Sequence, residues 1–372
     1  MGGAIPNAVG GNLSKANSYN FNLIRRGFIL RLPLYRRVLL FVAIFHFVAI
    51  LGYSLPVRLL RTDQNRDILA YYLVIERIHN NEPIYLNIPE KGPHKPTPSL
   101  YIYPPILSSM LAMMPVKSFV TFAQVWTLLL YVAFWIYAIC LAKLAVGHVT
   151  VTGVLVAGLA LTFFPGTHGA LSLGQADPFL WALFGISLTV PAFKGAGLMA
   201  VTLVKPWGMW PLLWSLRDGW RVITGALIVS FGCLVLGVLV RGTDVFYAEC
   251  LTWFIDVLPS LGQGSWSAGN WSISFGVLRV VKGLGLWDYS GGLLPFWARL
   301  WLLFCGITVP ILAGFFLRRK QIILQISVVG CSAVIFAPVC WIHSLPVLLT
   351  VLSLLAGQKM SSIQKPALGV HR

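Results

Sequence analysis

Long apolar runs, each nearly free of charged residues, recur along the whole of this chain of 372 residues. A helix needs about 20 such residues to cross the hydrocarbon core of a membrane. Charged residues make up only 10% of the chain, whereas a soluble domain has roughly 25%. The sequence therefore predicts an all-α integral membrane protein, a polytopic helical bundle of about eight spans, and argues against an ordinary soluble enzyme. The runs lie at about 38–56, 119–142, 150–165, 177–192, 221–240, 294–317, 321–337 and 344–356.

The distribution of charge predicts the orientation of these spans. The net charge of +17 could indicate nucleic-acid binding, but the basic residues punctuate the apolar runs instead of covering a polar domain. The rule that basic residues stay in the cytoplasm explains this pattern better. It places both termini in the cytoplasm and ten of the eleven acids outside, with Asp218 as the exception. The basic residues that then lie inside are Lys143, Lys194, Arg217, Arg221, Arg318, Arg319, Lys320, Lys359, Lys365 and Arg372.

This orientation divides the chain into three parts. Residues 1–36 form a basic cytoplasmic tail, 37–357 a polytopic membrane domain and 358–372 a second cytoplasmic tail. The first apolar run is too long for a signal-peptide core and has no small-residue cleavage site, so it is interpreted as an uncleaved anchor. The expected location is the plasma or inner membrane.

Two long loops, 58–118 and 242–293, are predicted to face outward. The first holds RDILAYYLVIERIH at 66–79, whose pattern predicts an amphipathic helix that lies on the membrane.

One apolar segment, 195–216, is interrupted by Lys205-Pro206 and again by Pro211. Proline removes a helix hydrogen bond, so the segment is interpreted as two half-helices. Basic residues stand on both sides of it, which favours a re-entrant hairpin, although a full span stays open.

The six cysteines form no CxxC pair, which favours packed thiols. Only Cys250 and Cys340 would lie near the outer face, where a disulfide between them is conceivable. The chain has no Walker loop, HExxH, GxSxG or CxxC metal frame, so neither a metal nor another cofactor is expected.

Four polar groups of residues fall on the outer face in this topology. Asp67 and Tyr71 are four apart, hence on one side of a helix. The others are GQAD at 174–177, SWSAGNWS at 265–272 followed by Arg279, and PVCWIHS at 338–344. Polar and ionisable groups at membrane depth are costly, so their convergence on one face indicates a functional site.

Each of these residues also has a structural alternative, which the sequence leaves open. Asp67 could complement a helix dipole, and Gln175 and Asp177 could cap the next helix. His343 could be a hydrogen-bonded core histidine. Trp266 and Trp271 could belong to an interfacial aromatic belt, and Lys205 could extend its ammonium group to the membrane surface.

In order along the chain, these motifs resemble those of the family-87 glycosyltransferases, the DUF2029 group. DILAYYLVIERIHNNEPIY (67–85) with YIYPP (101–105) resembles that family's first outer loop, D-x-x-x-Y … Y … F/Y-x-Y-P-P. LGQADPFL (173–180), VTLVKPWGMWPLLWSLRDGWR (201–221), GNWSISFGVLR (269–279) and APVCWIHSLPVLL (337–349) resemble its later motifs. The chain departs from the last motif, because Ser344 replaces a second His, Ala337 a Ser, and Cys340 the Ser before Trp.

The resemblance implies a fold of the GT-C type and a membrane glycosyltransferase, most closely a mannosyltransferase, acting on the cell envelope. Its donor would be a polyprenyl-phosphate sugar and its acceptor a lipid or glycan on the outer face. The implied catalytic residues are Asp67 and His343, with Asp67 as the base that takes the acceptor's proton. Arg279, then Lys205, would face the leaving phosphate. The remaining substrate-binding residues would be Tyr71, Tyr103, Gln175, Asp177, Trp266, Asn270, Trp271 and Trp341. Besides these substrates the expected partners are membrane lipids, with no nucleic acid.

The competing hypothesis is a flippase or other transporter of lipid-linked sugars. It would use the same polar residues without a base. Transporters that work by alternating access usually carry internal repeats, and this chain shows none.

Overall fold

The protein is helical throughout the part that the computed structural model describes. These residues are 55–60, 66–85, 101–116, 118–258, 271–287, 294–318, 321–338, 340 and 342–364, with isolated positions between 34 and 52. They contain no strand. The helices are α3 (Leu55–Leu60), α4 (Arg66–His79), α5 (Pro105–Ala112), α6 (Phe119–Val146), α7 (Val151–Phe163), α8 (Pro165–Leu173), α9 (Asp177–Thr189), α10 (Lys194–Val204), α11 (Met209–Ser215), α12 (Trp220–Arg241), α13 (Thr243–Thr252), α15 (Ile273–Gly283), α16 (Phe296–Phe316), α17 (Ile322–Ile335) and α18 (Leu349–Gln364).

Three of the described helices are long and apolar enough to cross a membrane: α6, α12 and α16, with 28, 22 and 21 residues. The pair α7 and α8, bent by 81° where they meet, could form a fourth. Other apolar runs form shorter helices, such as α9 with 13 residues and α17 with 14. The prediction of a helical membrane protein agrees with these lengths, and the number of spans stays a prediction.

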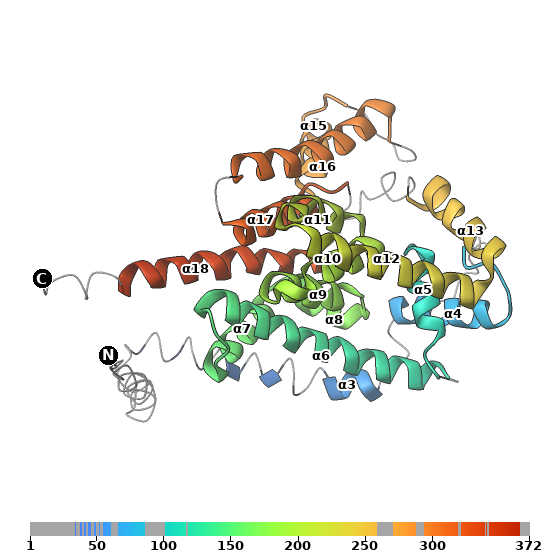
Figure 1. The fold of residues 1–372 in the computed structure, drawn as a ribbon, viewed down its shortest axis with the longest axis horizontal. Helices are drawn as coiled ribbons and strands as arrows, with labels where there is room; N and C mark the ends of the chain where they lie inside the picture. The colour runs from blue at the N-terminus through green and yellow to red at the C-terminus, as the bar shows by residue number, and fades with distance from the viewer. Residues whose placement is uncertain are drawn as a thin grey trace, which may run out of the picture.

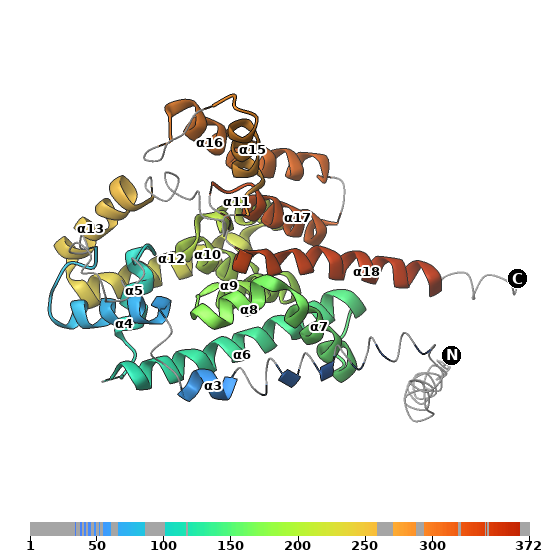
Figure 2. The ribbon, with the colours of Figure 1, turned by 180° about the vertical axis from the view of Figure 1, so that it is seen from behind.

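Helix α6 is the element around which the largest core is built. It packs on α4, α7, α9 and α18, and its residues Phe122, Phe134 and Tyr137 are fully buried. Helices α4, α5 and α13 gather at one end of the molecule, and the C-terminal end of α18 points to the opposite end (Figure 1; Figure 2). Different helices therefore form the two ends of the molecule along its long axis.

The predicted amphipathic helix at 66–79 is confirmed as α4, with the same bounds. The prediction that its apolar face lies on the membrane is wrong. Ile68, Tyr71, Val74, Ile75 and Ile78 are buried in the core that α4 forms with α5 and α6. A helical stripe of apolar residues fits a protein core as well as a lipid surface, because both only need one apolar face.

The break predicted at Lys205-Pro206 is confirmed. Helix α10 ends at Val204, and Lys205 has extended backbone angles (φ −135°, ψ 123°), as the residue before a proline prefers. A short 3₁₀ turn, η5 (Pro206–Gly208), then leads into α11. The second break, predicted at Pro211, is wrong. Pro211 is the third residue of α11, where a helix needs no backbone N–H.

The two ends of this broken segment meet. Lys194, the first residue of α10, forms an ion pair with Asp218, which ends the 3₁₀ turn η6 (Leu216–Asp218) after α11. The segment 194–218 is therefore a helical hairpin with Lys205 near its tip. The same ion pair explains why Asp218 is the one acid that the charge pattern places among the basic residues.

All six cysteines carry free thiols, as the absence of a CxxC pair predicted. Cys340 is buried and Cys250 is half-buried. The disulfide considered between them is therefore absent.

Helices α10 and α12 approach so closely that only glycine fits at their crossing. A Cβ atom on Gly195 would lie 1.9 Å from the carbonyl oxygen of Val222, and one on Gly225 would lie 2.9 Å from the backbone nitrogen of Ala196. The hairpin is thus held against α12 by backbone contact.

We expect Gly195→Ala to lower the thermal stability of the protein in detergent, because the added methyl group forces the two backbones apart. Overpacking of this kind typically costs about 1–3 kcal/mol. The matched control is Gly232→Ala on α12, where a Cβ meets nothing within 4 Å and alanine favours the helix. Equal melting temperatures for the two variants would contradict the close crossing.

Candidate functional site

A buried carboxylate, Asp177, lies at the centre of the polar residues that the structure brings together. It is the first residue of α9 and only 1% exposed. The Lys205 ammonium group lies 2.9 Å from Oδ1 and 2.8 Å from Oδ2, and the Ser344 hydroxyl donates to Oδ1 at 2.8 Å. Nε2 of His343 lies 3.5 Å from Oδ2. One carboxylate thus joins the start of α9, the tip of the hairpin and the 3₁₀ turn η8 (Ile342–Leu348).

These contacts decide two of the alternatives that the sequence left open. The residue before α9, Ala176, makes no side-chain cap, and the Asp177 carboxylate bonds other segments instead of its own helix. The Lys205 ammonium group does not extend to the membrane surface, because it bonds a buried carboxylate. A buried charge is tolerated when it is paired and hydrogen-bonded, and both conditions hold here.

A second carboxylate, Asp67, lies beside this group at the start of α4. The Gln175 amide donates a hydrogen bond to Oδ2 of Asp67, and its oxygen accepts one from the Tyr103 hydroxyl at 2.9 Å. Asp67 is half-buried, whereas Asp177 is almost fully enclosed. Since Gln175 and Asp177 are two residues apart, a single turn of chain carries both the partner of Asp67 and the second carboxylate.

Aromatic side chains surround the Asp67 end of the site. The Tyr71 ring lies 5.6 Å from that of Tyr103, 6.5 Å from that of Tyr101 and 5.1 Å from that of Trp126. Burial raises the pKa of Tyr103 well above its ordinary value. The Tyr103 hydroxyl therefore keeps its proton and stays the donor to Gln175.

The turn that carries Gln175 is fixed against α4 by Gly174. Gly174 has a φ of 72°, in the left-handed region, and a Cβ there would lie 2.1 Å from the Ile68 side chain. Its carbonyl oxygen accepts a hydrogen bond from the Trp126 indole at 2.8 Å. Only glycine allows both the backbone conformation and the contact with the helix that bears Asp67.

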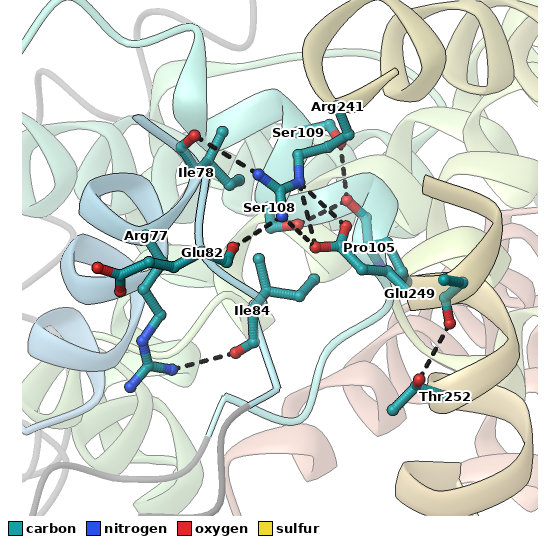
Figure 3. A network of polar contacts seen from close by, with 11 residues as sticks. Arg77, Ile78, Glu82, Ile84, Pro105, Ser108, Ser109, Arg241, Glu249 and Thr252 are labelled. Carbon is teal, nitrogen blue, oxygen red and sulfur yellow. Dashed lines mark hydrogen bonds and ion pairs between the residues drawn. The ribbon is translucent and has the colours of Figure 1, made fainter. Parts of the chain in front are cut away.

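The other end of α4 is held by a buried ion pair between α12 and α13. The Arg241 guanidinium binds Glu249 Oε1 at 2.5 Å and donates to the carbonyl oxygens of Ile78 at 3.5 Å and Glu82 at 2.8 Å. Arg77 donates to the carbonyl oxygen of Ile84 at 3.1 Å. Figure 3 shows Arg241 reaching from α12 to the chain after α4. The helix that presents Asp67 is thus anchored near both ends.

The segment 338–344 also touches the start of α15. The backbone N–H of Trp271 donates to the carbonyl oxygen of Cys340 at 2.6 Å, and the Trp271 side chain is exposed. Arg279, farther along α15, lies over the Phe275 ring at 5.4 Å. The structure thus connects the chain before α15 to the segment of His343 through a backbone hydrogen bond.

Seven of the residues singled out from the sequence form one connected group: Asp67, Tyr71, Tyr103, Gln175, Asp177, Lys205 and His343. Trp266, Asn270 and Trp341 lie outside the described residues. Sequence reasoning assigned no role to Ser344, which donates to Asp177. The available signal was its place beside His343, where the resembled motif has a second histidine. Within the described part of the chain, no three His, Cys, Asp or Glu side chains are grouped as a metal site would need.

No protein-family model matches the chain, and no match is found among curated proteins or solved structures.

We expect Lys205→Met to destabilise the protein strongly, because Asp177 would be left as a buried charge without its cation. Breaking a buried ion pair from one side costs about 3–5 kcal/mol. The control is Lys143→Met, which removes a half-buried lysine whose described bond goes to the carbonyl oxygen of Thr189. Thermal unfolding that does not distinguish the two variants would contradict the structural role of the pair.

We expect Glu249→Gln to loosen the C-terminal end of α4, since Arg241 would lose its charged partner. Hydrogen exchange of the amides at 76–82, followed by mass spectrometry, measures this directly. The matched control is Glu76→Gln, on the exposed face of α4. Unchanged protection of 76–82 in Glu249→Gln would show that the ion pair does not hold this helix.

Proposed function

We propose that the protein is an integral-membrane glycosyltransferase. It moves a sugar, mannose in the first place, from a polyprenyl-phosphate donor to a lipid-linked or cell-envelope glycan on the outer face of the membrane. The observation that carries this proposal is the half-buried carboxylate of Asp67 at the edge of a buried polar group. A transferase needs such a carboxylate within reach of an acceptor hydroxyl.

In the proposed reaction, the acceptor hydroxyl oxygen attacks the anomeric carbon of the donor sugar. The bond from that carbon to the phosphate oxygen breaks, and polyprenyl phosphate leaves with the electron pair. Asp67 takes the hydroxyl proton as the new glycosidic bond forms. An alcohol is a very weak acid, so removal of this proton during attack lowers the barrier.

The neighbours of Asp67 have matching roles in this proposal. Gln175 orients the carboxylate of Asp67 through its amide. Tyr71 and Tyr103 provide aromatic surface beside it. His343 and Lys205 lie deeper, on Asp177. Because Lys205 already balances Asp177, Arg279 is the first candidate to face the leaving phosphate.

The proposed topology has a GT-C-type bundle of about eight spans, with both termini in the cytoplasm and the loops 58–118 and 242–293 outside. The ion pair of Lys194 with Asp218 supports a hairpin that re-enters, because both ends of 194–218 meet. Helices α4 and α5 lie at the end of the molecule opposite to the C-terminal end of α18 (Figure 1). This arrangement also supports the proposed topology, in which loop 58–118 and the C-terminus lie on different sides of the membrane.

We expect Asp67→Asn to lower kcat about 10²–10⁴-fold, the usual cost of losing a general base, while the KM for donor changes little. The amide keeps the shape of the carboxylate but cannot accept the proton. The assay uses purified protein in vesicles, radiolabelled polyprenyl-phosphate sugars and a membrane lipid extract. Asp63→Asn, four residues earlier, is the matched control and should be nearly as active as the wild type.

Near-normal turnover in Asp67→Asn, with loss of turnover in Asp63→Asn, would show that the base is misassigned. If the labelled lipid crosses the bilayer without any transfer of its sugar, the transporter hypothesis replaces the transferase.

A further inference from the structure

A second polar site lies where α11 and its following turn meet the C-terminal end of α16. Trp214, Arg217, Phe315 and Arg318 line a hollow of about 440 Å³ there. The Trp214 and Phe315 rings meet edge to face, with centroids 5.3 Å apart. In both views the C-terminal ends of α16 and α18 point away from α5 and from α4, the helix that carries Asp67 (Figure 1; Figure 2).

The Arg217 guanidinium is held in place by neutral acceptors. It donates to Oε1 of Gln325 at 3.0 Å and to the carbonyl oxygen of Arg318 at 3.3 Å. Gln325 is itself only 1% exposed, and its amide donates to the carbonyl oxygen of Gly314 at 2.6 Å. A buried amide thus orients the cation without neutralising it.

Trp214 packs closely on α16 because residue 314 of that helix is glycine. A Cβ on Gly314 would lie 2.1 Å from the Trp214 indole. The contact of Trp214 with α16 therefore depends on the absence of a Cβ atom at Gly314.

The two guanidinium groups of the hollow, those of Arg217 and Arg318, have no ion-pair partner in the part of the chain that the structure describes. The adjacent acid, Asp218, is bound to Lys194. Arg319 and Lys320 follow directly in the sequence. Two guanidinium groups at one hollow favour an oxyanion, which each can bind through paired hydrogen bonds.

The rim of the hollow is apolar and exposed. Leu312, Phe315 and Phe316 on α16, and Leu213 and Leu216 beside Trp214, all present side chains to the outside. Helix α16 is long and apolar enough to cross a membrane. Cationic groups at the end of such a helix, next to exposed apolar side chains, fit a ligand with an anionic head and hydrocarbon tails better than a soluble anion.

We propose that this hollow binds the phosphate of an acidic membrane phospholipid, with Arg217 and Arg318 on the headgroup and the acyl chains along the apolar rim. The site does not depend on the glycosyltransferase proposal, because none of its lining residues takes part in the proposed reaction.

The test is native mass spectrometry of the full-length protein after delipidation and addition of phosphatidylglycerol or phosphatidylcholine. We expect the wild type to retain phosphatidylglycerol preferentially. Arg318→Gln should weaken that binding on the order of tenfold, the usual effect of one charge-assisted contact to a phosphate. Arg217→Gln should act in the same direction, with its fold checked by thermal unfolding.

The matched control is Arg299→Gln, which removes the same charge from the exposed N-terminal part of α16 and should leave lipid binding unchanged. Equal losses in Arg318→Gln and Arg299→Gln would overturn the site, because only net charge would then matter. A third arm adds inorganic phosphate alone. If it displaces the lipid at an equal concentration, the hollow is a site for free phosphate and the lipid proposal fails.

Discussion

The ion pair of Asp177 with Lys205 is the interaction on which the rest of this structure depends. A carboxylate that is 1% exposed in an apolar bundle is stable only with a cation and further hydrogen bonds around it. Lys205 supplies the cation, and Ser344 supplies a hydroxyl. Lys205 can reach Asp177 because the chain breaks before Pro206, and the hairpin returns to its start at Lys194. The pair therefore fixes the tip of the hairpin and the start of α9, and with it the turn that carries Gln175.

The same arrangement gives the two carboxylates different environments. Asp177 is enclosed and has three side-chain neighbours, which suits a structural centre. Asp67 is half-buried, is oriented by Gln175, and stands on a helix that is held by Gly174 at one end and by Arg241 at the other. Preorganised support of this kind keeps a catalytic group in one geometry. Helices α4 and α5 lie toward one end of the bundle, and the C-terminal end of α16 points away from them (Figure 1; Figure 2).

Local features of this fold could be predicted from the sequence, and distant pairings could not. The bounds of α4 and the break at Lys205 follow from apolar periodicity and from proline chemistry, both of which act within a few residues. Whether α4 packs on lipid or on protein depends on α5 and α6, so its own pattern could not decide. The sequence leaves Asp177 open between a helix cap and a residue of a functional site, because its partners lie 28 and 167 residues away. The hydrogen bonds from Arg241 to Ile78 and Glu82 join residues 163 and 159 positions apart, so no local pattern predicts them.

The proposed position of the donor sugar beside Asp67 is tested most directly by photoaffinity labelling with a polyprenyl-phosphate sugar that carries the reactive group on its sugar. The labelled peptides are identified by mass spectrometry, and unmodified donor serves as competitor. We expect competed labelling within α4, around Tyr103 and in the turn 174–177, because these segments surround Asp67. Labelling confined to α11 and the C-terminal end of α16, or labelling that unmodified donor does not reduce, would show that the donor sugar does not bind beside Asp67.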